Sequence, residues 1–201
     1  MNSQAHGAGW TDRALSTLRL TPAVVTSIGL ATGVAAPFVA KQGGVWIFTG
    51  AVLVAVTVLC DRAYPATTML RGTASRRALV FVPLAARITE AAWLYGFWKL
   101  GTPAGVVIAA GAISFTHEYV RARGMIAGLR DIGLSTLGER TIRGLVALAG
   151  YGTAGAVALT SSKLSAGLAT GIVTISATAW LLLGILGFVQ LLVVMSAALK
   201  R

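Results

Sequence analysis

Residues 166–199, AGLATGIVTISATAWLLLGILGFVQLLVVMSAAL, contain no Asp, Glu, Lys or Arg. A helix needs only about 20 apolar residues to cross a hydrocarbon core of about 30 Å. Because this stretch is longer than one crossing requires, it predicts a membrane helix that either extends beyond the bilayer or tilts strongly inside it.

Five more apolar stretches of similar character precede it, at residues 22–40, 45–60, 78–98, 103–120 and 143–160. Of the 201 residues, 56% are hydrophobic and 11% are charged, and the mean hydropathy is +0.78. These values are typical of a membrane-embedded chain. We therefore expect an all-α, polytopic membrane protein with six transmembrane helices. It should form one membrane domain over residues 1–201, with the six-helix bundle in residues 21–201.

Residues 1–20 are predicted to form a cytoplasmic tail that ends in a short amphipathic helix on the membrane surface. Its apolar residues recur near helical spacing, with Arg13 and Arg19 between them: Trp10, Ala14, Leu15, Leu18 and Leu20. Charged residues interrupt this segment before any apolar region, so we expect no secretory signal. An unstructured tail is the alternative.

Basic residues are concentrated in alternate connections between the apolar stretches. They precede the first stretch, separate the second from the third and the fourth from the fifth, and end the chain at Lys200 and Arg201. The other connections carry only Lys41, Lys99 and Lys163. The positive-inside rule then predicts an integral protein of the cytoplasmic membrane, with both termini and the two long loops in the cytoplasm.

The formal net charge of +11 does not require a nucleic acid partner, since anionic head groups or phosphorylated ligands at the cytoplasmic surface account for it. The single cysteine, Cys60, excludes an intrachain disulfide. Many of the 24 glycines lie inside apolar stretches, such as Gly29 with Gly33 and Gly184 with Gly187. Small residues let membrane helices approach closely, so these glycines predict helix contacts.

Ionisable groups inside a membrane are costly and are therefore candidates for a functional site. Arg87 and Glu90 are three residues apart in the third stretch, on one helix face, so they can neutralise each other. This pair either binds a ligand or only holds helices together. Asp61 follows the second stretch and is expected at a helix end on the cytoplasmic face, where a solvated end residue is the simpler interpretation.

The end of the fourth stretch carries a second group of candidates. Ser114, Glu118 and Arg121 share one helix face by their spacing. His117 next to Glu118 forms a possible acid/base site. A hydrogen-bonded histidine at the membrane boundary is the alternative interpretation.

Several segments together resemble the CDP-alcohol phosphatidyltransferases, six-helix membrane enzymes that move a phosphatidyl group from a CDP-linked lipid to an alcohol and release CMP. Residues 21–26, TPAVVT, are similar to that family's Thr-Pro-Asn-x-x-Thr start of helix 1, and residues 114–123, SFTHEYVRAR, to its helix 4 exit. Glu139 and Arg140 resemble the acidic-basic pair that precedes helix 5. The family commonly forms dimers, so the resemblance implies a possible homodimer, which the glycine-lined faces suit.

The family signature, Asp-x-x-Asp-Gly-x-x-Ala-Arg, eight residues, then Gly-x-x-x-Asp-x-x-x-Asp, aligns without gaps to residues 61–86. Only the first aspartate is present, as Asp61. Tyr64, Val82 and Ala86 stand at the other three aspartate positions. The remaining signature positions hold Pro65, Thr68, Met69 and Ala78.

In the family these carboxylates clamp two divalent cations, and the last aspartate is thought to deprotonate the acceptor alcohol. Magnesium needs several oxygen ligands in near-octahedral geometry, so one carboxylate should not hold it. Ala86 offers no base, and a positioned general base contributes about 10² to 10⁴ in rate. We therefore expect no metal and no cofactor. Phosphate binding by arginine needs no cation and is still possible.

Three functions from different classes remain open. The first is metal-independent conversion of a hydrophobic substrate, by isomerisation, cyclisation or elimination, in a repurposed cavity. The second is non-catalytic binding of a lipid or a partner subunit. The third is a divergent phosphatidyltransferase that uses Glu90 or Glu118 in a rearranged metal site.

For the repurposed site, which the retained polar residues favour, we assign roles to named side chains. Asp61 or Glu118 is the expected proton acceptor, His117 the proton donor, and Tyr64 a hydrogen-bond donor. Arg87 and Arg121 are expected to anchor an anionic or carbonyl group of a hydrophobic or amphiphilic substrate or lipid. Glu90 and Arg140 complete the predicted binding residues.

Overall fold

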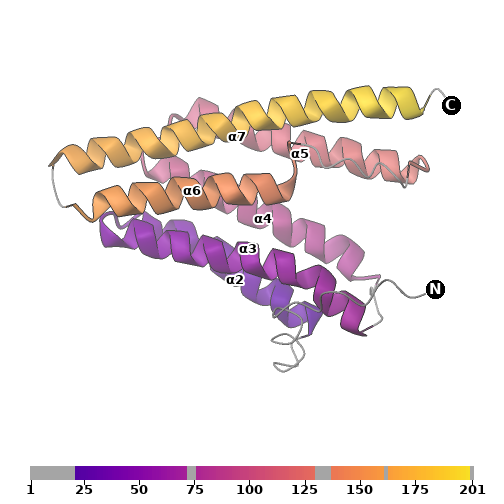
Figure 1. Cartoon of the computed structure of the whole chain (residues 1–201), viewed down its shortest axis with the longest axis horizontal. Helices are drawn as coiled ribbons and strands as arrows, with labels where there is room; N and C mark the ends of the chain where they lie inside the picture. The colour runs from indigo at the N-terminus through magenta and orange to yellow at the C-terminus, as the bar shows by residue number, and fades with distance from the viewer. Residues whose placement is uncertain (1–20, 72–75, 130–136, 161–162, 200–201) are drawn as a thin grey trace, which may run out of the picture.

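The computed structural model describes residues 21–71, 76–129, 137–160 and 163–199, and all regular structure in them is helical. Figure 1 shows the helices in chain order: α2 (Pro22–Ala40), α3 (Val45–Arg71), α4 (Ala78–Lys99), α5 (Ala104–Ile126), α6 (Arg140–Ala158) and α7 (Lys163–Ala198). The all-α class predicted from the sequence is confirmed. The predicted amphipathic helix before residue 21 lies outside the described residues.

Local sequence signals explain where the first helices begin and turn. The hydroxyl of Thr21 accepts a hydrogen bond from the Val24 N–H at 3.2 Å and caps α2, which starts at Pro22. Gly43 and Gly44, with φ of 77° and 54°, form the short turn into α3. The helices α2 and α3 therefore return on each other as an antiparallel pair (Figure 1).

The helices pack in a continuous sequence of contacts around an aromatic core. Helix α6 packs on α3, α7 packs on α6 and α5, and α4 lies against α2 and α5. Tyr151 is fully buried, donates its hydroxyl hydrogen to the carbonyl oxygen of Trp93 at 2.8 Å, and stacks near Phe97. Trp180 of α7 is 1% exposed and donates to Ser114 of α5 at 2.9 Å. These contacts join α6 to α4 and α7 to α5.

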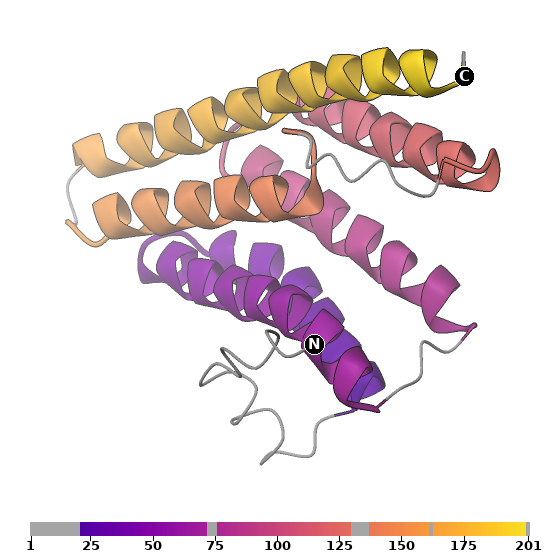
Figure 2. The same ribbon diagram turned by 45° about the vertical axis from the view of Figure 1, so that its right-hand side comes forward.

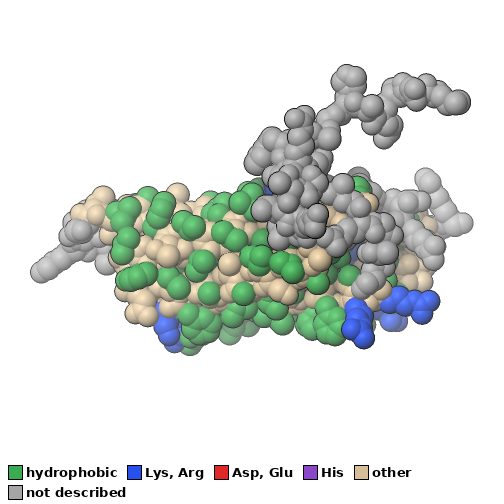
Figure 3. Space-filling model, turned by 90° about the horizontal axis from the view of Figure 1, so that it is seen from below, with side chains coloured by type: hydrophobic (Ala, Val, Ile, Leu, Met, Phe, Trp, Pro, Cys, Tyr) green, Lys and Arg blue, Asp and Glu red, His purple; other side chains and the backbone are tan. Residues whose placement is uncertain are grey.

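Four helical segments are long and apolar enough to cross a membrane: Pro22–Ala40, Val45–Met69, Ala78–Lys99 and Gly167–Ala198. Figure 3 shows a face whose middle is covered by apolar side chains, with Lys and Arg near its two ends. The chain is therefore an integral membrane protein. Helices α5 and α6 do not meet the same criteria of length and composition, so their crossing of the membrane stays a prediction. The orientation of the two termini also stays a prediction.

The last apolar stretch lies in one helix of 36 residues, α7, as predicted from the lack of charged residues at positions 166–199. At about 1.5 Å per residue it is about 54 Å long, well beyond a hydrocarbon core of about 30 Å. In Figure 1, α7 runs over the whole length of the bundle.

Among the helix boundaries that differ from the sequence prediction, two concern candidate site residues. Helix α3 does not end near Cys60 but continues to Arg71, so Asp61 lies inside a helix rather than at its end. Helix α6 begins at Arg140 rather than at residue 143, so Arg140 belongs to a helix and not to a cytoplasmic loop. In both places the helix extends beyond the apolar stretch of sequence, because its charged side chains are neutralised by partners from other helices.

Close packing of glycines supports the predicted helix contacts. A Cβ on Gly33 would lie 2.6 Å from the side chain of Thr89 in α4, and one on Gly29 would lie 3.1 Å from Cys60 in α3. A Cβ on Gly184 would lie 2.9 Å from Ile113 in α5. Gly187 likewise packs against the backbone of Gly138.

Two glycines of α6 provide a test of how closely this helix packs on α3. A Cβ at Gly155 would lie 2.5 Å from the backbone nitrogen of Phe48, whereas a Cβ at Gly152 meets nothing within 4 Å. We predict that Gly155→Ala destabilises the protein by about 1–3 kcal/mol, because the α3 backbone cannot move aside cheaply. Thermal unfolding in detergent measures this. Gly152→Ala should unfold at or slightly above the wild-type temperature, and equal behaviour of the two variants would contradict the packing of α6 on α3.

Candidate functional site

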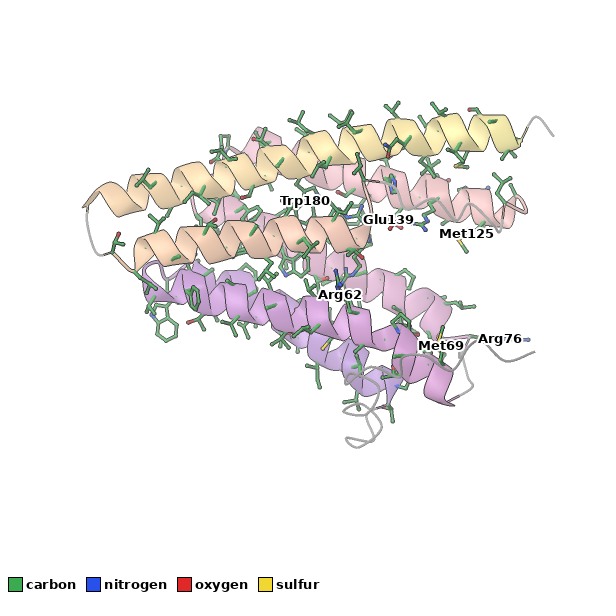
Figure 4. All side chains as sticks on the ribbon, in the orientation of Figure 1. Arg62, Met69, Arg76, Met125, Glu139 and Trp180 are labelled. Carbon is green, nitrogen blue, oxygen red and sulfur yellow. The ribbon has the colours of Figure 1, made fainter. Side chains whose placement is uncertain are left out.

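A cavity of about 910 Å³ lies among α2, α3, α4, α5 and the start of α6. Its walls are mainly apolar, with Leu30, Val82, Leu84, Phe115 and Met125 among the lining side chains. Figure 2 shows α4 separating from α5 toward its first residues. In Figure 4, Met125 points from α5 toward α4, and Glu139 lies at the start of α6. A volume of this size holds a ligand as large as a typical cofactor or drug.

One ion pair at this cavity joins α3 to α6. The guanidinium of Arg140 donates to both carboxylate oxygens of Asp61, each at 2.9 Å. The same group donates to the carbonyl oxygen of Ala86 at 2.6 Å and to the hydroxyl of Thr89 at 3.1 Å. Arg140 thus binds α3 and α4 at once, in the bidentate geometry that gives arginine pairs their strength.

A second carboxylate, Glu90, lies behind the cavity wall and is 1% exposed. Arg87 donates to its Oε1 at 2.9 Å and lies 2.8 Å from its Oε2, as the three-residue spacing predicts. Arg143, itself 2% exposed, donates to Glu90 Oε1 at 3.1 Å. Two arginines from α4 and α6 therefore neutralise one buried acid.

Glu118 of α5 completes this network and also faces the cavity. Its Oε1 accepts from Arg143 at 2.8 Å and lies 3.7 Å from Arg87. The side chain of Glu118 is 30% exposed and lines the cavity. Glu118 is therefore held by arginines from α4 and α6 and still presents part of its side chain to the cavity.

His117 is placed differently from its neighbour. It is fully buried and is not among the residues that line the cavity. Its Nδ1 lies 3.9 Å from Glu118 Oε1. His117 therefore does not meet a ligand in this cavity directly.

The other predicted site residues lie at the cavity. Tyr64 lines it from α3, and Arg121 lines it from α5, where it pairs with Glu139 at 3.3 Å. The structure thus brings six predicted residues to one cavity: Asp61, Tyr64, Arg87, Glu118, Arg121 and Arg140. Glu90 and His117 lie behind its wall.

Two members of this network, Arg143 and Glu139, were not among the predicted site residues. Arg143 also donates to the carbonyl oxygen of Gly138, so it fixes the start of α6 to α4 and α5. The available signal was the three-residue spacing of Arg140 and Arg143, which puts both on one helix face.

The cavity also locates the aligned signature positions. Asp61, Tyr64, Val82 and Ala86, which stand at the family's four aspartate positions, all line it. Their chemistry does not fit a pair of divalent cations, since they include one carboxylate and Arg140 binds both of its oxygens. Among the described residues, no group of three or more His, Cys, Asp and Glu side chains is arranged to hold a metal.

These features define a membrane protein with the fold of the CDP-alcohol phosphatidyltransferases. The chain is similar to the crystal structure of phosphatidylinositol phosphate synthase (PgsA1) of Mycobacterium tuberculosis in complex with manganese and citrate. The identity is 24%, the TM-score is 0.68, and the match covers 92% of this chain and 86% of that one. It is also similar to that synthase with CDP-DAG bound, at 25% identity and a TM-score of 0.63, with 90% of each chain covered.

No protein-family model matches the sequence, and no curated protein matches it significantly. The resemblance predicted from the sequence is confirmed at the level of the fold.

Removing Arg143 tests whether the network supports the fold. We predict that Arg143→Met destabilises the protein by about 3–5 kcal/mol, because Glu90 and Glu118 lose their shared partner and a buried carboxylate is left with less compensation. Thermal unfolding in detergent measures the change. Arg123→Met on exposed α5 surface is the matched control and should change stability little. A wild-type unfolding temperature for Arg143→Met would contradict the structural role of this arginine.

Proposed function

We propose that the protein binds a hydrophobic or amphiphilic molecule in the cavity between α2, α3, α4, α5 and α6 and converts it without a metal ion. The reaction class is isomerisation, cyclisation or elimination. The likeness in fold to a lipid-using synthase supports a lipid-like substrate, since the neighbour binds CDP-DAG. Folds of one architecture carry different chemistries, so the proposal depends on the site and not on the fold.

The observation that carries the proposal is the pairing of Asp61 with Arg140. A carboxylate that is to bind a metal must present its oxygens to that metal, but both oxygens of Asp61 accept hydrogen bonds from one guanidinium. The guanidinium also binds Ala86 and Thr89 and is therefore held firmly. A tethered cation of this kind fills the position that a divalent ion would need.

Glu118 is the proposed proton acceptor. Its Oε1 is held by Arg143, and its side chain is 30% exposed and lines the cavity. In an isomerisation or a cyclisation, Glu118 takes a proton from one carbon of the substrate and a proton returns at another, so no oxidant, reductant or net proton is required. Asp61 is the weaker candidate for the proton acceptor, because Arg140 donates hydrogen bonds to both of its carboxylate oxygens.

Two other functions have specific support. Non-catalytic lipid binding is favoured by the pairing of the cavity carboxylates with arginines, which suits a structural role. Phosphatidyl transfer is favoured by the similarity to a synthase that binds CDP-DAG.

One experiment separates the three functions. Purified protein in lipid nanodiscs is incubated with a membrane lipid extract, with CDP-diacylglycerol and an alcohol panel, and with magnesium, manganese or chelator. Chelator-resistant formation of a product of unchanged mass, or of lower mass after elimination, supports the proposal. Chelator-sensitive CMP release would establish phosphatidyl transfer instead. A retained lipid without any product would establish non-catalytic binding.

Replacement of the proposed base gives the sharper prediction. Glu118→Gln should lower turnover by about 10² to 10⁴, because the amide cannot accept the proton. Substrate binding should change less, since the amide has nearly the same shape. Product formation is measured by chromatographic separation of product from substrate, since an isomer has the same mass, and ligand retention is measured by mass spectrometry. Thr116→Val on the same helix, outside the cavity, is the control; full turnover in Glu118→Gln would remove this residue as the base.

The predicted homodimer is a separate proposal. Its support is the number of exposed large apolar side chains on the helices, which suit either lipid or a second copy. Mass measurement of the protein in detergent distinguishes a dimer from a monomer. A strictly monomeric state would contradict it.

A further inference from the structure

The charged side chains of the large cavity balance one another. Among the described residues that line it, three carry a negative charge and three a positive charge: Asp61, Glu118, Glu139, Arg87, Arg121 and Arg140. Directly behind the wall, Glu90 and Arg143 add one charge of each sign. The lining therefore carries no net charge, although the chain as a whole carries +11.

The arginines of the cavity are also already engaged. Arg140 lies 2.8 Å from Asp61, and Arg121 lies 3.3 Å from Glu139. Arg87 lies 2.8 Å from Glu90 and is 15% exposed. A ligand phosphate could take one of these arginines only by displacing a carboxylate from it.

That displacement is unfavourable in a partly buried site. Each carboxylate that loses its arginine keeps its charge in a medium where an unpaired ion costs several kcal/mol. A diphosphate brings further negative charge next to Asp61 and Glu118, and these residues offer no metal ion site to offset it. Head groups without net charge avoid this repulsion and can still accept or donate hydrogen bonds.

An adjoining cavity of about 500 Å³ has little effect on the balance of positive and negative charges in the large cavity. It shares Thr26, Tyr64, Ala78 and Val82 with the large cavity, and Arg77 is its one charged lining residue in the described part of the chain. Arg77 is exposed to solvent, where water and salt screen its charge.

We infer that the cavity selects an amphiphile whose head group carries no net charge, uncharged or zwitterionic, and rejects a nucleoside diphosphate lipid. The inference rests on the proposed function in that the cavity must bind an amphiphile. The apolar walls take the hydrocarbon part of such a molecule. The paired charges provide hydrogen-bond partners for hydroxyl, carbonyl or ester groups of its head.

Competitive binding of four lipid probes tests this selection. Diacylglycerol, phosphatidylcholine, phosphatidic acid and CDP-diacylglycerol are offered in equal amounts, with chelator, to the full-length protein in neutral detergent, and bound lipid is measured by native mass spectrometry. We expect diacylglycerol or phosphatidylcholine to be bound at least about tenfold more than either anionic lipid. Preferred binding of an anionic lipid would overturn the inference but leave amphiphile binding intact. Binding of no probe would overturn the inference and count against the proposed function as well.

Charge variants show whether the paired groups cause the selection. Asp61→Asn leaves Arg140 without its acid and should shift the preference toward the anionic lipids by about tenfold. Glu118→Gln should shift it the same way through Arg143, and serves as a second variant if Asp61→Asn does not fold. Gln42→Lys adds the same charge in the exposed turn after α2 and should leave the preference unchanged. An equal shift in Gln42→Lys would show that overall charge, and not the cavity, determines the preference.

Discussion

The buried carboxylate of Glu90 is the constraint on which the arrangement of the site depends. A charge that is 1% exposed is tolerated only when opposite charges and hydrogen bonds compensate it. Arg87 compensates it from the same helix, and Arg143 compensates it from α6. Since Arg143 reaches Glu90 only when α6 starts near Arg140, the position of α6 against α4 follows from this one acid.

The same arginine determines the geometry of the cavity. Arg143 divides its donors among Glu90, Glu118 and the carbonyl oxygen of Gly138, so it holds α4, α5 and the start of α6 in one network. Arg140, one turn earlier, extends the network to Asp61 in α3. The cavity is thus bounded on its charged side by groups that are fixed by one another, and its remaining walls are apolar side chains. Such a site is preorganised for a ligand that does not compete for the ion pairs.

The apolar stretches predicted the helical class and the long last helix, because hydrocarbon length and charge content are properties of the sequence alone. They did not predict that α3 continues past Asp61 to Arg71 or that α6 begins at Arg140. Hydropathy treats each charge as a reason for a helix to leave the membrane, whereas in the structure Asp61 and Arg140 neutralise each other across two helices. The roles of Arg143 and the burial of His117 were missed for the same reason, since both follow from contacts between segments far apart in the chain. Residues three apart on one helix, Arg87 and Glu90, could be paired correctly because their contact is local.

The spacing shared with the phosphatidyltransferase signature has a physical explanation that does not require its carboxylates. Positions 61, 64, 82 and 86 face one cavity because α3 and α4 both pack on α2, and this arrangement depends on the backbone as much as on the side chains. Position 86 illustrates the point. Ala86 has no acid to offer, but its carbonyl oxygen accepts a hydrogen bond from Arg140 at 2.6 Å. An aspartate there would add a negative charge beside Asp61, and Arg140 alone could not neutralise both. The small apolar side chain at this position therefore leaves Arg140 of α6 free to bind Asp61 of α3 together with Ala86 and Thr89 of α4.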